Sequence, residues 1–519
     1  MKKLPLGIQS FEKLRGDNHL YIDKTRDAFK MVNQGTYFFL SRPRRFGKSL
    51  FLDTLKCLFE GRKALFNDLY IADKWDWSKK YPVIKISFGG DVFKSSDHLE
   101  KTIIGILQKN EKDNKVSVTN KETIGNYFKF LMEACHEKHQ MPVVVLVDEY
   151  DKPVLDNITN EETAISIRNT LRGFYTAIKD SDQYIKFVFL TGVSKFSKMN
   201  LFSGLNNLRD ITLSPEYGTI CGYTHSDVEK SFSEYLNPAE PEDKVDLEEL
   251  KRWYNGYSFA GEPVYNPYDI LLFFQEGNKF KSYWFETGTP TFLMDMIREK
   301  QYFLPDLEAL EVSEQTLNTF DVGNIPIESL MFQTGYLTIK NIATVFTNTV
   351  YTLSYPNFEV KNAFNSYLIN YLTEHRFHHT GQLYKSLLED DFMTFKSQIE
   401  RLFSSIPYSS HGNLYHYEGF YVSVIYSFLA SLGLDLTAED ITNKGRADLT
   451  LKFPGHNKIY IFEFKVVEED RSNTKKPLEQ IKEKRYFEKY LGTVQKIFLI
   501  GIEFSKEKRN LVGFDWERI

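Results

Sequence analysis

The N-terminal part of the chain alternates short apolar runs with longer segments in which apolar residues recur at helical spacing. The short runs predict β-strands at residues 37–40, 83–88, 143–147 and 185–190. The longer segments predict helices at residues 49–59, 97–110, 121–138 and 161–179. The run 143–147 (Val-Val-Val-Leu-Val) is apolar throughout, which is typical of a parallel strand covered on both faces. The pattern predicts an α/β domain built on a doubly wound parallel sheet.

The pattern changes after about residue 215. Turn-rich segments at 253–257 and 265–267 are flanked by short helical patterns, and alternating runs at 335–340 and 350–355 predict a hairpin. We therefore expect a mainly α-helical middle region, and the hairpin allows a winged-helix unit at its end.

The last part of the chain returns to a mixture of helices and strands. Residues 359–404 are helical in pattern, residues 407–413 are typical of a linker, and helix, strand, strand, helix and strand follow. These changes of pattern predict three domains, at residues 1–215, 216–375 and 376–519.

Length and charge limit the classes of protein to consider. A chain of 519 residues is too long for one hydrophobic core, which agrees with several domains. The formal net charge of −5 excludes a uniformly basic surface, so any contact with nucleic acid requires local basic patches. Clusters of Lys and Arg at 475–476, 482–485 and 506–509 are candidates, although their acidic neighbours make a plain solvated surface an equal alternative.

Cysteine usage and hydropathy indicate the compartment. Cys57, Cys135 and Cys221 are far apart and form no Cys-x-x-Cys pair, which argues against disulfides and a zinc ribbon. The apolar run from Phe420 to Leu434 is shorter than the roughly 20 residues that span a bilayer. The N-terminus has no signal-peptide pattern. We expect a cytoplasmic protein that makes no membrane contact.

A phosphate-binding loop is predicted at residues 42–49 (Arg-Pro-Arg-Arg-Phe-Gly-Lys-Ser), between an apolar strand and a helix. Backbone N–H groups and a helix N-terminus would bind the phosphates, Lys48 would reach the β- and γ-phosphates, and Ser49 would ligate Mg²⁺. Arg42 stands where the usual motif has Gly, and a chance Gly-Lys-Ser at a helix start is the alternative. The predicted nucleotide-binding residues are Arg44, Arg45, Phe46, Gly47, Lys48, Ser49, Leu50, Asp148 and Thr191.

An acid pair at the end of the strongest strand completes this site. Asp148 would hold Mg²⁺ together with Ser49, and Glu149 would polarise the attacking water. The combination of loop and acid pair predicts binding of ATP or GTP. Thr191, at the tip of a strand expected between the loop strand and the acid strand, is the candidate sensor. Ser194 is the second choice, and capping of the turn is the alternative role for both.

Two other polar residues near this site have weaker patterns. Arg209 is one of several candidates for an arginine finger that completes a neighbouring subunit's site, so assembly into a homo-oligomer is left open. Asp151 follows the acid pair closely, and we interpret it as a solvated residue at a helix start.

A second site is predicted near the C-terminus. In the strand 459–465, alternation places Glu463 and Lys465 on one face, and Asp448 lies on the preceding strand. Antiparallel pairing would bring Asp448 beside Glu463, and two carboxylates suit Mg²⁺ or Mn²⁺. Lys465 would orient the attacking water or stabilise the charge of a phosphodiester transition state. An exposed strand edge is the alternative interpretation of Glu-x-Lys.

Residues on flanking helices would extend this second site. Glu418 begins the apolar helix before these strands and could complete a second metal position. Gln480 and Lys484 lie one turn apart in the following helix and would line the same cleft, with Tyr486 nearby. For Gln480, Lys484 and Tyr486 a plain surface role is the alternative.

Taken together, these segments resemble a prokaryotic family of predicted ATPases fused to a PD-(D/E)XK nuclease domain. The segments that carry the resemblance are residues 21–25 (Tyr-Ile-Asp-Lys-Thr), 42–50, 148–151 (Asp-Glu-Tyr-Asp), 190–196, 253–257, 265–267, 445–448 (Gly-Arg-Ala-Asp) and 463–465 (Glu-Phe-Lys). Arg42 matches this family's own loop, and Ala447 stands where the name of the nuclease motif has Pro, without loss of a ligand. The resemblance implies an AAA-like P-loop domain, an α-helical extension and a restriction-endonuclease-like C-terminal domain. It suggests roles in defence or mobile elements.

These predictions lead to an ATP-binding and ATP-hydrolysing protein with a Mg²⁺-dependent nuclease site that cleaves nucleic acid, with DNA favoured over RNA. The alternative is a nucleotide-gated signalling or scaffold ATPase whose nuclease-like domain only binds nucleic acid or a partner. A third hypothesis is an ATPase motor or recombination factor that moves on DNA without cutting it.

Overall fold

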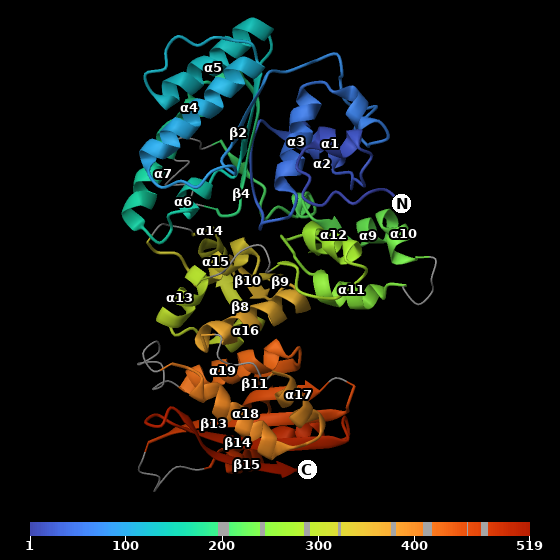
Figure 1. Cartoon of the computed structure of the whole chain (residues 1–519), viewed down its shortest axis with the longest axis vertical. Coiled ribbons are helices and arrows are strands. Elements are labelled where there is room, and N and C mark those ends of the chain that lie inside the picture. The colour runs from blue at the N-terminus through green and yellow to red at the C-terminus, as the bar shows by residue number, and fades with distance from the viewer. Residues whose placement is uncertain are drawn as a thin grey trace. The chain divides into compact units, whose positions relative to one another are not determined.

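The computed structural model describes residues 1–195, 207–238, 244–284, 291–319, 323–374, 380–407, 418–453, 455–468 and 476–519. The chain folds into two compact units (Figure 1). Unit 1 contains Met1–Trp284 and Glu311–Asn357, and unit 2 contains Phe285–Leu310 and Phe358–Ile519. The chain therefore passes from one unit to the other at three places, and these places differ from the predicted domain boundaries after residues 215 and 375.

A five-stranded parallel sheet organises the first part of unit 1. Its strands are β1 (Tyr37–Ser41), β2 (Val83–Ser87), β3 (Val143–Asp148), β4 (Ile185–Gly192) and β5 (Arg209–Asp210). They lie in the order β2-β3-β4-β1-β5, and every neighbouring pair is parallel. The predicted parallel sheet is confirmed, and β4 lies between the strand before the loop and the strand that ends in the acid pair.

Helices cover both faces of this sheet, as the apolar strands require (Figure 1). The helices on one side are α1 (Phe11–Gly16), α2 (Thr25–Gln34) and α3 (Lys48–Phe59). Those on the other side are α4 (Ser96–Asp113), α5 (Ile124–His139) and α7 (Glu161–Lys179), with the short α6 (Lys152–Leu155) before α7. The helices predicted from periodicity are confirmed within a few residues.

The rest of unit 1 is largely helical. One group contains β6 (Tyr223–Thr224), α9 (His225–Ser231), α10 (Ser233–Leu236), α11 (Leu247–Tyr254), β7 (Val264–Tyr265) and α12 (Pro267–Gln275). The next group contains β8 (Leu310–Ser313), α14 (Glu314–Asn318), α15 (Ile327–Thr334), β9 (Thr338–Val345) and β10 (Asn348–Ser354), with the sheet order β8-β10-β9. This second group occupies the segment where a winged-helix unit was expected, and its hairpin is confirmed.

Unit 2 is built on a mixed five-stranded sheet. The strands β11 (Asp435–Thr442), β12 (Gly445–Phe453), β13 (Lys458–Val467), β14 (Lys496–Ser505) and β15 (Asn510–Arg518) lie in chain order. Only the pair β13–β14 is parallel. The sequence predicted neither β11 nor β15. Both are edge strands with several exposed and charged positions, so neither has the apolar run of a buried strand.

Helices α13 (Thr291–Glu299), α16 (Phe358–Leu372), α17 (Thr380–Leu388), α18 (Phe392–Ser404) and α19 (Glu418–Ser431) precede the sheet, and α20 (Pro477–Lys484) lies between β13 and β14. Residues 419–430 of α19 are all buried, as expected for the apolar run at 420–434. Among the described helices, none has both the length and the apolar character needed to cross a bilayer.

Candidate functional site

The predicted phosphate-binding loop joins β1 to α3. Gly47 ends the loop with φ 90°, a conformation that glycine adopts without strain, and α3 starts at Lys48. Gly47 is exposed, whereas Ser49 and Leu50 are half-buried. The free N–H groups of the first turn of α3 therefore follow directly on the loop, which is the arrangement that binds phosphate in nucleotide-binding proteins.

Lys48 is buried within the loop. Its ammonium group donates hydrogen bonds to the carbonyl oxygens of Arg42 at 2.9 Å and Pro43 at 2.8 Å. Burial lowers the pKa of Lys48, and the nearby Asp148 carboxylate opposes this shift. An ammonium group has three donors, so Lys48 must release at least one carbonyl to contact two phosphate oxygens.

Arg42 does not point toward the phosphate position of the loop. Its guanidinium group is buried and donates to the carbonyl oxygens of Ser41, Thr212 and Tyr217 at 2.9, 2.8 and 3.1 Å. It also lies 4.0 Å from the centre of the Phe259 ring. Burial lowers its pKa to about 10, so Arg42 remains a cation at neutral pH. Arg42 thus fixes the start of the loop in place of the usual glycine.

The other predicted loop residues divide into buried and exposed ones. Phe46 is 1% exposed, and its ring packs edge-on against Tyr257 at 4.9 Å. Its side chain anchors the loop, so any nucleotide contact by Phe46 must use its backbone. Arg44 and Arg45 are exposed, and the guanidinium group of Arg45 lies 4.8 Å from the Tyr268 ring. Both arginines are free of carboxylate partners among the ion pairs of the described residues, so they are available to phosphate oxygens.

Asp148 and Glu149 lie at the end of β3, as predicted. Asp148 is 5% exposed, and its Oδ1 has no hydrogen-bond partner among the described residues. Glu149 has φ 53°, an uncommon conformation for this residue type, and its carboxylate lies over Gly89, where any Cβ would be 3.0 Å from Oε2. Burial and the Asp148 charge raise the pKa of Glu149. The unpaired oxygen of Asp148 fits a cation held near Lys48.

The tip of β4 lies beside this acid pair. Thr191 is fully buried, and its hydroxyl donates to the Leu40 carbonyl at 2.9 Å. The interpretation of Asp151 as a solvated residue is wrong. Asp151 is 1% exposed, and its Oδ2 accepts from the backbone N–H groups of Val193 and Ser194 and from the Ser194 hydroxyl at 3.0, 2.6 and 2.6 Å. Ser194 therefore serves as a partner of Asp151.

Arg209 lies on the edge strand β5. Its guanidinium group donates to Gln34 at 3.1 Å and pairs with Glu216 at 3.3 Å, and its side chain is 44% exposed. The structure describes a single chain, so a role as an arginine finger remains a prediction.

The second site is formed by adjacent strands of unit 2. The antiparallel register of β12 and β13 ends with the pair Leu449 and Phe462. Asp448 and Glu463 are the next residues of the two strands, and the same register continued by one residue would place them opposite each other. Directly opposed residues lie on the same face of a sheet. Asp448 Oδ2 accepts a hydrogen bond from Phe464 N at 2.7 Å. The two predicted carboxylates are therefore brought together as expected.

The electrostatics of this pair are those of a cation site. Burial is the main cause that raises the pKa of both Asp448 and Glu463, and the Asp448 charge adds to the shift at Glu463. Glu463 is 4% exposed, and its Oε2 has no hydrogen-bond partner among the described residues. A buried carboxylate oxygen without a partner is costly unless a proton or a cation occupies the position.

Other predicted residues surround this pair. Gln480 on α20 donates to Glu463 Oε1. Tyr486 is buried, lies against Gly445 and has its pKa raised by burial and by the Glu463 charge. Lys465 is half-buried on β13, two residues after Glu463, whereas Lys484 is exposed at the end of α20. The structure places Gln480 and Tyr486 at the carboxylate pair.

Glu418 lies near the pair but has a different partner. It is exposed at the start of α19, and its Oε2 accepts a hydrogen bond from Val466 N at 3.3 Å. Its charge still raises the pKa of both Asp448 and Glu463. No group of three or more His, Cys, Asp or Glu side chains among the described residues could hold a metal ion together. The donor set that the structure offers an ion is thus the pair Asp448 and Glu463, completed by water.

Comparisons with known proteins agree with this arrangement of two sites. A family model described as "Predicted AAA-ATPase" matches residues 5–202, and one described as "PD-(D/E)XK nuclease superfamily" matches residues 416–514. The chain is also similar to a protein of Azotobacter chroococcum mcd 1 described as "Uncharacterized protein in vnfD 5'region". The two are 48% identical over 519 residues, which cover 99% of this chain and 98% of that protein. The chain therefore belongs to the predicted AAA-ATPase-like family with a C-terminal PD-(D/E)XK nuclease superfamily domain.

Proposed function

We propose that this protein binds and hydrolyses ATP and cleaves nucleic acid at a Mg²⁺- or Mn²⁺-dependent site, with DNA as the preferred substrate. The observation that carries the nuclease part is the pair Asp448 and Glu463 on adjacent strands, with an unpartnered buried oxygen on Glu463. DNA is preferred to RNA on the family resemblance alone. In the cell, ATP would control when cleavage occurs.

In the nucleotide site, each residue has a distinct task. Lys48 would exchange a carbonyl of its own loop for the phosphates, and the N–H groups at the start of α3 would bind phosphate oxygens. Asp148 and Ser49 would hold Mg²⁺. Glu149, whose raised pKa favours proton uptake, would accept a proton from the attacking water. Thr191 would contact the γ-phosphate from the tip of β4.

In the nuclease site, Asp448 and Glu463 would hold the metal ion, and Gln480 would orient Glu463 through their hydrogen bond. A bound divalent ion supplies a coordinated water of lowered pKa and neutralises charge on the phosphate. Lys465, on the same face of β13 as Glu463, would orient the attacking water or stabilise the transition-state charge. Glu418 would complete a second metal position only after releasing Val466 N.

The segment from β8 to β10 has the element order of a winged helix, but we propose that it does not read a DNA groove. Six of the eight residues of α15 are buried, including Leu330 and Phe332. The hairpin of β9 and β10 has one basic residue, Lys340, and its ammonium group donates to the Pro356 carbonyl at 2.9 Å. A helix that recognises bases in a DNA groove needs exposed polar side chains, and a wing that contacts phosphates needs available basic side chains. We therefore assign this segment a structural role in the ATPase unit.

Cleavage assays with matched variants test the proposal. Supercoiled plasmid is incubated with the full chain in Mg²⁺ or Mn²⁺, with and without ATP. We expect nicking or linearisation by the wild type and by Glu400→Gln, a control at a half-buried position on α18, and none by Asp448→Asn. Lys48→Ala should bind ATP at least about a hundredfold more weakly, because it loses a charge-assisted contact to phosphate. Cleavage that survives in Asp448→Asn would contradict the nuclease assignment.

One observation favours the alternative of a nucleotide-gated scaffold or signalling ATPase. The nuclease-like site offers two carboxylates rather than a group of three metal ligands among the described residues. Under this alternative, no condition gives cleavage, Glu463→Gln keeps full cellular activity, and Lys48→Ala loses it. An RNA duplex and a single-stranded DNA, run beside the plasmid, test the choice of substrate.

A further inference from the structure

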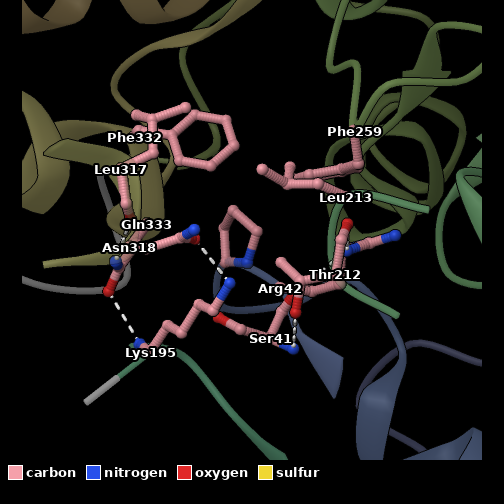
Figure 2. Close-up of a pocket in the computed structure, with 11 residues that line it drawn as sticks. Ser41, Arg42, Lys195, Thr212, Leu213, Phe259, Leu317, Asn318, Phe332 and Gln333 are labelled. Carbon is pink, nitrogen blue, oxygen red and sulfur yellow. Dashed lines mark hydrogen bonds between the residues drawn. The ribbon is translucent and has the colours of Figure 1, made fainter. Parts of the chain in front are cut away.

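The segment after β4 connects the nucleotide site to α14 and α15. The backbone N–H of Lys195 donates to Gln333 Oε1 at 2.8 Å. Its ammonium group donates to Asn318 Oδ1 at 2.5 Å and pairs with Asp210 at 2.5 Å. Figure 2 shows Lys195 extending toward Asn318, with Gln333 beside it. With its side chain only 13% exposed, one lysine thus joins the end of β4 to β5, α14 and α15.

The position of Lys195 is set by Tyr150 and Asp151, the two residues that follow the acid pair at the end of β3. Asp151 accepts three hydrogen bonds from Val193 and Ser194, the two residues before Lys195. Tyr150 donates its hydroxyl hydrogen to the Ser194 carbonyl at 3.1 Å. A shift at the end of β3 is therefore carried through short, buried contacts to Lys195.

The phosphate-binding loop meets the same helices from the other side. Gly335, which ends α15 with φ 93°, lies against Pro43, and any Cβ there would be 2.9 Å from the proline ring. Pro43 and Lys195 line one small cavity together with Asn318 and Gln333 (Figure 2). Lys48 holds the Pro43 carbonyl at 2.8 Å and must loosen its hold on Pro43 or Arg42 to bind two phosphate oxygens. Nucleotide binding thus acts on a wall of this cavity.

Gln333 would pass such a change to both helices at once. Its amide nitrogen donates to the Leu317 carbonyl and to the Ser329 hydroxyl, both at 3.1 Å. Leu317 belongs to α14 and Ser329 to α15, so one side chain joins the two helices to Lys195. If Lys195 moves, Gln333 must move with it or lose the partly buried hydrogen bond from the Lys195 backbone N–H.

We propose that Lys195, Asn318 and Gln333 form a latch that reports the state of the nucleotide site to α14 and α15. This regulation rests on the proposed ATP binding. In the nucleotide-free form, Lys48 holds the loop carbonyls and the latch is closed. A bound triphosphate draws Lys48 away, repositions Pro43 and the tip of β4, and weakens the contacts of Lys195 with Asn318 and Gln333. The two helices then become free to rearrange.

Hydrogen exchange of the full chain, with and without ATP and Mg²⁺, tests the latch. In the wild type we expect ATP to slow exchange in the loop peptide 42–50 and to change exchange in peptides 314–319 and 327–335 by about fivefold or more. Lys195→Ala removes the ammonium contacts with Asn318 and Asp210 but keeps the backbone N–H that donates to Gln333. It should keep the response of the loop and strongly reduce the response of the helices. Asn318→Ala, which removes the contact with the Lys195 ammonium group, should reduce the response of the helices. Lys195→Arg keeps a positive charge at this position and should retain more of that response than Lys195→Ala.

Lys85→Ala is the matched control, because it removes another partly buried lysine of unit 1 that pairs with Asp53 at 2.8 Å, far along the chain from α14 and α15. It should respond like the wild type. Helix peptides that respond equally in Lys195→Ala, or that do not respond in the wild type although the loop does, would overturn the latch. No response of the loop in any variant would instead contradict the proposed ATP binding.

Discussion

At the scale of single residues, two buried charged groups determine how the sites are held. Arg42 is a guanidinium cation that is stabilised by three backbone carbonyl groups and an aromatic ring, and it forms no ion pair with a carboxylate of the described residues. Glu463 is a buried carboxylate that accepts one side-chain hydrogen bond and leaves its other oxygen unpartnered among the described residues. The first stabilises the start of the loop, whereas burial of the second is costly unless a cation or a proton accompanies it.

Replacing Arg42 should destabilise unit 1 strongly. Arg42→Gln leaves the Thr212 and Tyr217 carbonyls without their donor, which we expect to cost about 2–4 kcal/mol. Arg44→Gln changes an exposed neighbour and should stay within about 0.5 kcal/mol of the wild type. Differential scanning calorimetry of the full chain measures both. Equal melting of the two variants would show that the buried contacts of Arg42 contribute nothing.

The effect of Glu463→Gln on the free energy of unfolding should depend on pH. In the folded chain, burial and the Asp448 charge raise the pKa of Glu463 from 4.5 to about 8. The folded state therefore holds its proton more tightly than the unfolded state. The resulting stability is present below pH 4.5 and is lost as the pH rises through about 8. The Gln side chain cannot ionise, so the variant does not lose this stability. At pH 8.5 without metal we therefore expect its free energy of unfolding to exceed that of the wild type by about 2 kcal/mol, which corresponds to a melting temperature roughly 4–8 °C higher.

At pH 5.5 this advantage should be much smaller, and below pH 4.5 it should vanish. Mg²⁺ at pH 8.5 should raise the melting temperature of the wild type and leave the variant unchanged, because metal binding requires the ionised carboxylate. Parallel melting curves of both proteins across this pH range would contradict the raised pKa. Asp448 has a raised pKa as well, so the measured profile belongs to the pair.

At the scale of elements, the segment between α11 and β7 holds the phosphate-binding loop. Tyr257 packs against Phe46, and Phe259 packs against both Phe46 and the Arg42 guanidinium group. Ser258 N donates to Thr338 Oγ1 at 2.7 Å, which ties the segment to β9. Gly256 has φ 126°, and any Cβ there would meet the Pro356 carbonyl, so only glycine fits. The turn-rich motif at 253–257 is thus a support for the loop.

Truncation of this support should weaken nucleotide binding. Phe259→Ala removes the ring below Arg42 and leaves a cavity, at a cost of about 3–5 kcal/mol. Since the loop is then less ordered, we expect ATP to bind about tenfold more weakly. Phe232→Ala, in the separate core around α9 and α12, should be destabilised to a similar degree while the folded protein keeps its ATP affinity. Isothermal titration below the melting temperature measures the difference. Equal affinities of the two variants would contradict the supporting role.

At the scale of the whole molecule, the two units are interwoven in sequence. Residues 285–310 belong to unit 2, although residues 311–357 return to unit 1 before unit 2 continues. In unit 2, Glu308 pairs with Lys361 at 2.5 Å and accepts from Tyr426, and Leu304 N donates to Ser423 Oγ at 3.2 Å. The nuclease-like domain therefore depends on a segment that precedes the last elements of the ATPase unit.

Fragments should show this dependence. Residues 358–519 alone lack the buried Met294, Ile297, Leu304 and Leu307, each worth about 1.5–3 kcal/mol of burial, so we expect the fragment to aggregate or to melt without cooperativity. A chain of residues 285–310, a flexible Gly-Ser linker and residues 358–519 restores unit 2 and should melt cooperatively. Circular dichroism melting compares the two. Cooperative melting of the shorter fragment at the same temperature would contradict the dependence.

The sequence predicted those features whose causes are local or nearly so. The strand at 143–147 is apolar at every position, and the structure buries all of it. Asp448 and Glu463 could be placed together because alternation and antiparallel pairing relate their faces once both strands are recognised. Thr191 could be placed at the tip of a strand between β1 and β3 from the motif context alone.

Other features depend on contacts between residues that are distant in sequence. Nothing local distinguishes Asp151 from a solvated helix-start residue, because its partners lie more than 40 residues away, directly after β4. The inward orientation of Arg42 requires Thr212, Tyr217 and Phe259, which sequence spacing cannot bring together. The edge strands β11 and β15 form because a neighbouring strand offers them hydrogen bonds, not because of their own apolar pattern.

By itself, the sequence determined the parallel sheet, the positions of both acid pairs and the loop between β1 and α3, because apolar periodicity and short motifs act within one element or between neighbours. Only the tertiary structure decided which charges are buried, where the two units divide the chain, and that Lys195 reaches α14 and α15. Burial and partner choice are properties of the packed chain, since a side chain's surroundings come from segments whose separation in sequence has no fixed relation to their separation in space.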